Sequence, residues 1–312
     1  MSNLSLAILA YKGIDELISL VTHYIKKRRS SREERENENL DFVLLNLSGN
    51  KLSPEAIKKI KTWGECGVIS KDIPFIELSD PETYMDNISE FCSNIIEELI
   101  KKDHIINNLL LGKYILIPPG LPSLSLAFMS IFHGITGTIP RMSFFYKEDG
   151  TFNVIKPFDF HSLRNESRGR LRLENRDKDY VLINLAGRCL SEEAIEEVKT
   201  WFENPIIELD IPNLDLNNPD TYMDNVLLFC NSKIDELIAQ ENLKDNLVLG
   251  KFILVPPALS SVDVSLISIL HGICGQYPLM SFFYRKNNLF YLTRPVDFQD
   301  LCNKFRDEIS KI

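Results

Sequence analysis

The sequence has no stretch that is long and apolar enough to span a bilayer. It has no Walker A pattern, and no Gly-x-Gly-x-x-Gly follows a predicted strand, so both common glycine-rich nucleotide loops are missing. A Gly-x-Ser-x-Gly nucleophile elbow is also missing, as is any set of His, Cys and carboxylate residues at metal-ligand spacing. The sequence therefore predicts no metal and no cofactor, and no motif in it demonstrates an enzyme.

Cysteine is scarce, and none of the six cysteines forms Cys-x-x-Cys. This excludes a zinc ribbon and favours reduced, mostly buried thiols in a cytoplasmic protein. Basic residues are also in deficit, because the formal net charge is -9. Duplex nucleic acid is held through many contacts between Lys or Arg and phosphate, so we expect no duplex partner. A small anionic ligand in one local pocket is compatible with this charge.

The first residues, MSNLSLAILAYKGIDELISLVTHYIKKRR, do not have the order of a signal peptide, because the basic cluster follows the apolar part. Their helical spacing predicts an amphipathic helix that packs on the first domain or on a partner. Contact with a membrane surface is the alternative, although we expect no membrane partner.

The most informative feature is an internal repeat. Shifted by 138 positions, the chain matches itself without a gap from Asp41 to Leu163, with about half of the positions identical. The segment ILIPPGLPSLSLAFMSIFHG returns as ILVPPALSSVDVSLISILHG, with the same Pro-Pro and the same His-Gly. This period is far too long for a solenoid unit, so the chain is one domain in duplicate.

Two charge-dense segments flank the copies and predict the domain boundaries. The expected organisation is an N-terminal amphipathic helix and charged linker (1–40), copy one (41–163), a charged linker (164–178) and copy two (179–312).

Each copy has a pattern of strands and helices typical of an α/β fold. In copy one, DFVLLNL predicts a buried strand, and Ser53 and Pro54 can begin the following helix. A short strand around 68–69, a helix over 83–101, a strand ended by Pro118 and a third helix follow. RMSFFY and FNVI flank KEDG, which predicts a hairpin. This order implies a three-layer, mainly parallel sheet with an antiparallel C-terminal edge hairpin.

In such sheets ligands bind beyond the carboxyl ends of the strands, so three loops of each copy should converge on one face. Two of these loops also begin helices, whose free N–H groups suit anions. The middle loops are DIPF, from Asp72, and DIPN, from Asp210. The outer two loops of each copy supply the predicted ligand-binding residues. These are Asn46, Ser48, Gly49, Asn50, Pro119, Gly120 and Ser123 in copy one, and Asn184, Gly187, Arg188, Pro257, Ala258 and Ser260 in copy two.

Several repeated side chains allow two interpretations. His133 and His271 lie late in an apolar helix, where a structural histidine with its charge favoured by the helix dipole is expected; catalysis or ligand contact is the alternative. Tyr84 and Tyr222 can pack in the core or stack on a base.

The segments LLNLSGNKLSPEAI, LIPPGLPSLSLAFMSIFHGITGTIPRMSFFY and FNVIKPFDFHSL together resemble the CRISPR-associated Csx-fifteen family, and the likeness covers almost all of each copy. The sequence departs from the family pattern at Ile117 and Val255, where the family has Asn before Pro-Pro. Gly120 becomes Ala258 and Asn50 becomes Arg188, so the two half-sites cannot be chemically identical.

The resemblance implies two tandem Rossmann-like domains that form a pseudo-dimer within one chain, with further oligomerisation open. It also implies a role in type III CRISPR antiviral signalling, with a cyclic oligoadenylate as the ligand between the copies. Sequestration is the expected activity. One alternative is a metal-independent ring nuclease acting through the ligand's 2′-hydroxyl, and another is an interaction scaffold with no nucleotide ligand.

Overall fold

The structure is a computed structural model that describes residues 18–19, 21–23, 40–73, 83–100, 108–109, 111–148, 151–172, 174, 178–201, 206–211, 214–240, 243–286 and 289–310. Within the predicted N-terminal helix, residues 18–19 and 21–23 are helical, and Ile18 and Val21 are buried in the main core. No helix among the described residues is long and apolar enough to cross a membrane.

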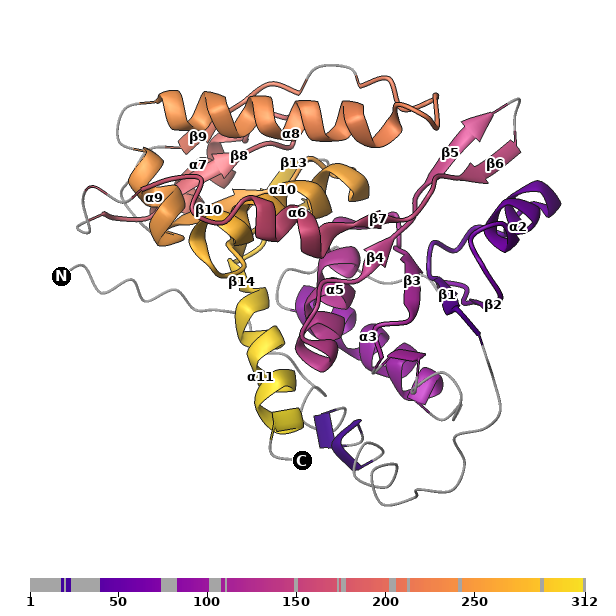
Figure 1. Ribbon diagram of the computed structural model, residues 1–312. Coiled ribbons are helices and arrows are strands. Elements are labelled where there is room, and N and C mark those ends of the chain that lie inside the picture. The colour runs from indigo at the N-terminus through magenta and orange to yellow at the C-terminus, as the bar shows by residue number, and fades with distance from the viewer. Residues whose placement is uncertain are drawn as a thin grey trace.

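The two copies contain the same elements in the same order (Figure 1). The first comprises β1 (Phe42–Asn46), α2 (Pro54–Lys61), β2 (Cys66–Ser70), α3 (Tyr84–Ile100), β3 (Tyr114–Ile117), α5 (Pro122–Thr136), β4 (Arg141–Met142), β5 (Phe145–Glu148), β6 (Thr151–Val154), β7 (Phe158–Asp159) and α6 (Phe160–Glu166). The second comprises β8 (Val181–Asn184), α7 (Glu192–Lys199), β9 (Ile206–Glu208), α8 (Tyr222–Ala239), α9 (Leu243–Leu249), β10 (Phe252–Val255), α10 (Ser260–Cys274), β11 (Leu279–Met280), β12 (Phe283–Lys286), β13 (Leu289–Leu292), β14 (Val296–Asp297) and α11 (Phe298–Ser310). The sequence did not predict α9.

Each copy contains a five-stranded, mostly parallel sheet. The strand orders are β2-β1-β3-β4-β7 and β9-β8-β10-β11-β14, and only the last strand of each is antiparallel to its neighbour. The mixed α/β class and the mainly parallel sheets are therefore confirmed.

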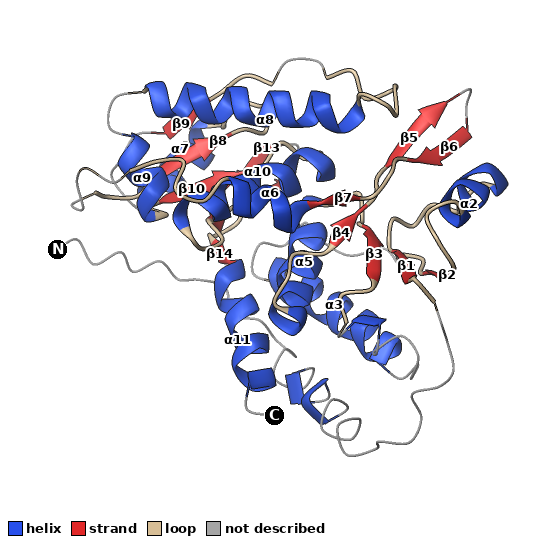
Figure 2. Ribbon diagram, viewed as in Figure 1, coloured by secondary structure: helices blue, strands red, loops and turns tan. Residues whose placement is uncertain are grey.

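The predicted edge hairpin is wrong in one respect. The hairpins form, but β5–β6 and β12–β13 are separate two-stranded sheets, and β5–β6 projects away from its main sheet (Figure 2). The antiparallel edge is instead the two-residue strand β7 or β14. The reason is that MSFFY leaves the sheet after its Met: Ser143 bonds both Leu116 and Ile155, and the chain turns outward there.

The sequence signals at helix ends act as expected. The side chain of Ser53 accepts a hydrogen bond from Ala56 N, and Pro54 is the first residue of α2. Ser191 caps α7 in the same way. A small apolar cluster under α2 and another under α7 cover the outer face of each sheet.

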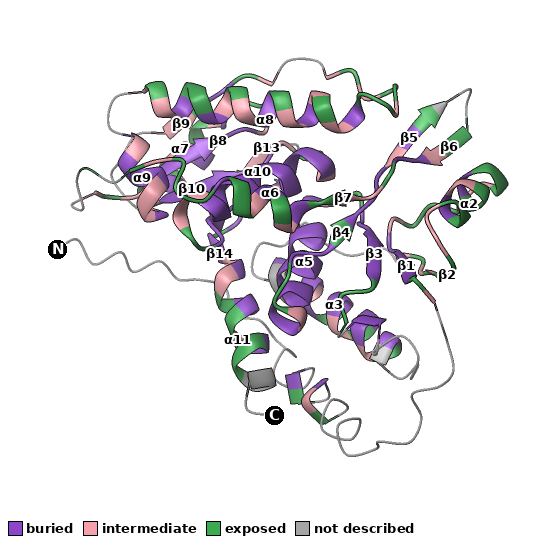
Figure 3. Ribbon diagram, in the orientation of Figure 1, coloured by how far each residue is buried: buried purple, intermediate pink, exposed green. Residues whose placement is uncertain are grey.

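The inner faces of both sheets share one continuous hydrophobic core. That cluster joins Leu45 and Phe132 of copy one to Leu254 and Phe305 of copy two. Helices α5 and α10 lie at its centre and are buried over almost their whole length (Figure 3). The two copies are thus packed as a pseudo-dimer with a common interior.

The terminal helices of the copies are exchanged. Helix α6, at the end of copy one, packs on α10 of copy two, and α11, at the end of copy two, packs on α5 of copy one (Figure 1). The contacts are close, since a Cβ at Gly134 would lie 2.5 Å from the carbonyl oxygen of Cys302, and one at Gly272 would lie 2.2 Å from that of Arg164. The repeated His-Gly therefore marks the two helix crossings.

Burial at the crossings also settles the charge of the histidines. His133 and His271 are buried, and their pKa values are lowered to about 3 and about 2, first by desolvation and then by nearby arginines. The expectation that the helix dipole favours charged histidines is wrong, because desolvation outweighs the dipole. His133 Nδ1 lies 2.9 Å from the hydroxyl of Tyr277, which marks a structural role.

Candidate functional site

The first loop of each copy is organised by its asparagine. Asn46, at the end of β1, is buried; its Nδ2 donates to Asn50 O at 2.8 Å, and its Oδ1 accepts from Ser48 Oγ at 2.7 Å. Asn184 is also buried, and its Nδ2 donates to Arg188 O at 2.8 Å. Both amides are therefore used inside their own loops and set the loop shape.

The loops meet as predicted within each copy. A Cβ built at Gly49, which has φ +75°, would lie 3.8 Å from the side chain of Ile73, in the second loop. At Gly187, with φ +64°, the corresponding distance to Ile211 is 3.6 Å. The first and second loops are thus in contact. The remaining residues of the second loops, from Pro74 and Pro212 onward to Phe75 and Asn213, lie outside the described part of the chain.

Two pairs of aromatic rings join the copies symmetrically. Tyr84 of copy one stacks on Phe282 of copy two at 6.0 Å, and Phe144 stacks on Tyr222 at 6.3 Å. Since 84 and 222, and 144 and 282, are equivalent repeat positions, the two contacts are related by a pseudo-twofold axis.

Each tyrosine hydroxyl is hydrogen-bonded within its own copy, Tyr84 to Ser123 at 2.9 Å and Tyr222 to Ser261 at 3.0 Å. Burial raises the pKa of Tyr84 to about 12 and also raises that of Tyr222, so both phenols stay neutral. Ser123, predicted to bind ligand, is fully buried in this contact.

A cavity of about 170 Å³ lies between the copies, beside these contacts. Copy one contributes its first loop, its third loop and the start of its hairpin, and copy two contributes Tyr222 and the start of α10. The lining residues are Ser48, Asn50, Ile117, Pro118, Pro119, Gly120, Phe144, Phe145, Tyr222, Ala258, Leu259, Ser260 and Ser261. We call this the shared cavity.

Six of the predicted site residues line the shared cavity, namely Ser48, Asn50, Pro119, Gly120, Ala258 and Ser260. Asn46, Gly49, Ser123, Asn184, Gly187 and Arg188 are not among its lining residues. The sequence did not single out Phe144 and Phe145, although MSFFY repeats exactly as written in both copies and is a signal that could have indicated them.

The two copies are also hydrogen-bonded at this cavity. Ser260 Oγ of copy two donates to the carbonyl oxygen of Pro119 at 2.8 Å, and Ser125 Oγ lies 2.7 Å from the same oxygen. The equivalent of Ser125 in copy two is Asp263, which is fully buried and has no hydrogen-bond partner for either carboxyl oxygen. The contact is therefore made on one side of the axis only.

Helices α5 and α10 begin at the shared cavity without a side-chain cap. The residues that precede them, Leu121 and Leu259, offer no capping oxygen, so the first N–H groups of both helices remain open. Open N–H groups and the positive end of the helix dipole favour an anion at this position.

The third loops differ in backbone conformation. Ala258 has φ +64°, the left-handed region, whereas its equivalent Gly120 does not have positive φ. A Cβ at Gly120 would meet nothing within 4 Å, so this glycine borders open space. The cost of holding an alanine in the left-handed region is roughly 1–2 kcal/mol. The substitution between copies thus changes the loop, not only its side chain.

Arg188 lies apart from the shared cavity. Its guanidinium sits over the ring of Phe290, 4.7 Å from the centroid, on hairpin β12–β13 of its own copy. Its predicted contact with phosphate stays a prediction.

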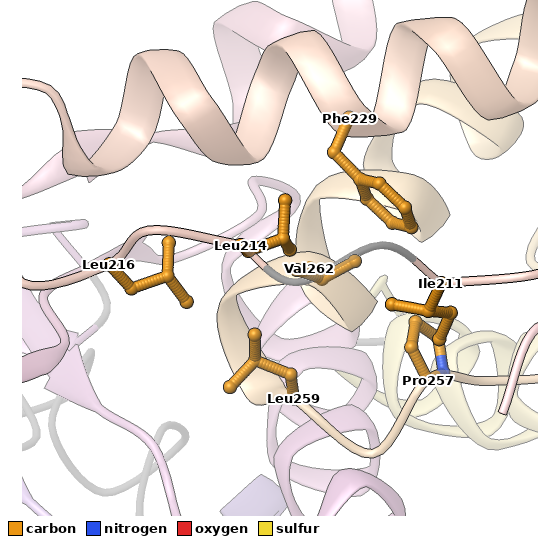
Figure 4. A pocket seen from close by; sticks show the side chains of 7 residues that line it. All are labelled: Ile211, Leu214, Leu216, Phe229, Pro257, Leu259 and Val262. Carbon is orange, nitrogen blue, oxygen red and sulfur yellow. The ribbon is translucent and has the colours of Figure 1, made fainter. Parts of the chain in front are cut away.

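A second cavity, of about 220 Å³, lies within copy two (Figure 4). We call it the apolar pocket. Its lining residues come from the second loop, from α8 and from the start of α10: Ile211, Leu214, Leu216, Phe229, Pro257, Leu259 and Val262. The predicted residue Pro257 therefore lies in this pocket.

The shared cavity is poor in groups that could transfer a proton. Among the described residues that line it, Tyr222 alone has an ionisable side chain, and burial raises its pKa. Serine hydroxyls, an asparagine amide and open backbone N–H groups supply the remaining polar contacts. This set can hold phosphate and hydroxyl groups, but it offers no general base near neutral pH.

Comparison with known proteins gives no family model and no curated protein that matches the chain. Solved structures of the Acinetobacter baumannii Cap4 SAVED/CARF-domain containing receptor are similar to it. The complex with the cyclic trinucleotide 3'3'3'-cAAA has 14% identity and a TM-score of 0.40, over 83% of this chain and 52% of that chain. The complex with 2'3'3'-cAAA has 12% identity and a TM-score of 0.41, over 89% and 55%. The chain spans about half the length of these receptors, and at these TM-scores the likeness assigns neither family nor ligand.

Proposed function

We propose that the protein captures a cyclic oligoadenylate at the shared cavity and sequesters it. The observation that carries the proposal is one cavity lined by both copies, at which two uncapped helix N-termini begin. Backbone N–H groups at helix starts bind phosphates without needing arginine or lysine, which suits a chain of net charge -9.

Duplication of the loop set supports a ligand with internal symmetry. A ring of repeating nucleotides presents the same phosphate and ribose more than once, and a pseudo-twofold receptor offers two similar loop sets to it. The resemblance of each copy to the Csx-fifteen family supports a cyclic oligoadenylate of type III CRISPR signalling as that ring. On the same basis we propose a Rossmann-like fold for each copy and action in the cytoplasm.

The size of the shared cavity indicates how the ring would lie. Small-molecule sites commonly measure about 300–1,000 Å³, so a cavity of 170 Å³ accepts only part of a ring. Gly49, Asn50, Gly120 and Ala258 are exposed around it and would form the wider bed for the rest. The ring would therefore rest on the loops with one portion inserted between the copies.

Capture without rapid cleavage follows from the chemistry of the lining. Opening the ring by its own 2′-hydroxyl requires alignment with the phosphate, a base for the proton, and stabilisation of the developing charge. The loops supply alignment and N–H groups but no base, so turnover should be slow or absent. A ring nuclease is the alternative that product analysis would detect.

Calorimetry with cyclic tri-, tetra- and hexa-adenylate tests the proposal. The variant Asn50→Asp adds one negative charge at the cavity, and Asn165→Asp adds the same charge on exposed α6 as the matched control. We expect Asn50→Asp to weaken binding at least about tenfold, equal to ~1.4 kcal/mol, and Asn165→Asp to leave it unchanged. Absence of binding by every ring, or equal effects of the two variants, would refute capture at this cavity.

A further inference from the structure

The apolar pocket of copy two presents aliphatic side chains that are only partly covered. Ile211, Leu214, Leu216 and Leu259 are of intermediate exposure, and all four border the same space (Figure 4). Leu214 and Leu216 alternate along the chain with exposed Asp215, so the polar side chain is outside and the leucines face the pocket. Apolar surface arranged around a space of this kind favours an apolar occupant.

The pocket is continuous with the shared cavity through one loop. Ala258 lines the shared cavity, while its neighbour Pro257 lines the apolar pocket, and Leu259 lines both. The left-handed conformation of Ala258 turns the chain between the two spaces. A ligand held over the loop can therefore reach both spaces at once.

The chemistry of the pocket selects the part of a ligand that can enter. None of its seven lining residues has a charged or hydrogen-bonding side chain. A phosphate or a ribose would lose hydration there without compensation, whereas a flat, uncharged ring would not. Phe229 and Pro257 offer ring surfaces, and a base stacks on an aromatic side chain whatever its sequence context.

The repeat preserves this apolar character. The equivalent positions of copy one are Ile73, Ile76, Leu78, Phe91, Pro119, Leu121 and Leu124. All seven are apolar, although about half of the aligned positions differ between the copies. The apolar composition at these positions has thus been retained in both copies.

We propose that the apolar pocket binds one purine base of the ring, while the phosphates of the same ring lie at the shared cavity. This inference rests on the proposed function and deepens it, because it assigns the base and the phosphates to separate, adjoining spaces. Base recognition then depends on copy two residues that the phosphate contacts do not use.

The test uses cyclic tri-, tetra- and hexa-adenylate in which one adenine is replaced by 2-aminopurine, whose fluorescence is quenched by stacking. Leu216→Asp places a carboxylate at the pocket, and Leu216→Phe fills it without charge. Leu228→Asp is the matched control, because Leu228 lies on α8 beside Phe229 but is 72% exposed.

With the wild-type protein we expect binding and quenching. Loss of one base stack corresponds to a weakening of about 5–150-fold, so both Leu216 variants should weaken ring binding within this range and abolish quenching. Leu228→Asp should match the wild type. Circular dichroism of each variant establishes that the fold is retained.

The outcomes separate the two proposals. If no ring binds the wild-type protein, the proposed function fails and the base site fails with it. If the rings bind but remain unquenched, and both Leu216 variants bind as tightly as the wild type, the base site alone is refuted. Equal weakening by Leu228→Asp would also refute it, because the effect would then be one of charge.

Discussion

His133 and His271 lie face to face across the junction of the two copies, with ring centroids 5.4 Å apart. Tyr277 contacts both, and its ring centroid is 4.5 Å from that of His271. The two histidines are equivalent in the repeat, so the pseudo-twofold axis passes near them. They lie towards the ends of α5 and α10 remote from the loops, which excludes them from the ligand site and makes them part of the joint.

Acid should weaken this joint. Both folded-state pKa values lie well below the ordinary 6.5, so below pH 6.5 the unfolded chain binds protons that the folded protein refuses. The stability is therefore present above pH 6.5 and is lost as the pH falls towards 3. Each histidine contributes a slope of up to about 1.4 kcal/mol per pH unit.

Urea unfolding at several pH values measures this slope. His271→Phe removes one titrating group whose Nδ1 has no hydrogen-bond partner, and should flatten the slope between pH values of about 6 and 4. His23→Gln, at an exposed histidine, is the control. Identical slopes for the wild type and His271→Phe would contradict a buried neutral histidine.

The helix crossings should not tolerate a methyl group. Glycine to alanine inside a helix normally stabilises by up to about 1 kcal/mol. At Gly134 and Gly272 the new Cβ would lie within 2.5 Å of a carbonyl oxygen of the exchanged helix, so the sign should reverse. We expect Gly134→Ala and Gly272→Ala to destabilise by about 1–3 kcal/mol, the range for overpacked interiors.

Gly120→Ala provides the comparison for this measurement, because its Cβ would meet nothing within 4 Å. Thermal unfolding should place that variant near the wild type. Stabilisation by Gly272→Ala would show that α6 does not pack on α10.

Asp263 should cost stability near neutral pH. Burial raises its pKa well above 3.8, so the folded protein retains a proton that the unfolded chain releases. Its contribution is greatest below pH 3.8 and is lost as the pH rises through the folded value, opposite in sign to that of the histidines. Asp263→Ser, which installs the equivalent residue of copy one, should stabilise by about 1–3 kcal/mol at pH 8. Denaturant unfolding at pH 8 and pH 5 checks this, and a gain no larger at pH 8 than at pH 5 would contradict it.

Ala258 should be under backbone strain. Ala258→Gly removes the penalty of positive φ and should raise the free energy of unfolding, with the gain reduced by the greater freedom of glycine in the unfolded chain. We expect a net gain of up to about 1 kcal/mol by chemical denaturation. Ala127→Gly, inside helix α5, is the control that should destabilise. A loss at Ala258 as large as that at Ala127 would contradict the left-handed conformation.

The sequence predicted the elements well because their signals are local. The apolar run of β1, the cap at Ser53 and the stop at Pro118 each depend on a few neighbouring residues. The exchange of α6 and α11 was not predicted, since it pairs segments far apart in sequence that have no local pattern in common. The one available signal was a glycine inside an apolar helix, repeated at 134 and 272, which indicates a close approach.

The candidate site was predicted in place but not in detail. Parallel strands bring their carboxyl ends to one edge, so the convergence of the loops followed from topology. The role of Asn46 could not be read from the sequence, because an amide that closes its own loop and an amide that holds a ligand give the same letter. The one-sided contact of Ser260 with Pro119 depends on how the copies are packed, which local sequence does not encode.

The number of rings bound per chain tests the central claim most directly. If the ligand lies between the copies at the shared cavity, two nearly equivalent loop sets serve one ring. Native mass spectrometry with cyclic tri-, tetra- and hexa-adenylate should therefore show a complex of one ring per chain for the ring that binds, with no second ring at saturation and with Asn50→Asp reducing its abundance. Two rings per chain, one for each copy, or no complex with any ring, would contradict capture between the copies.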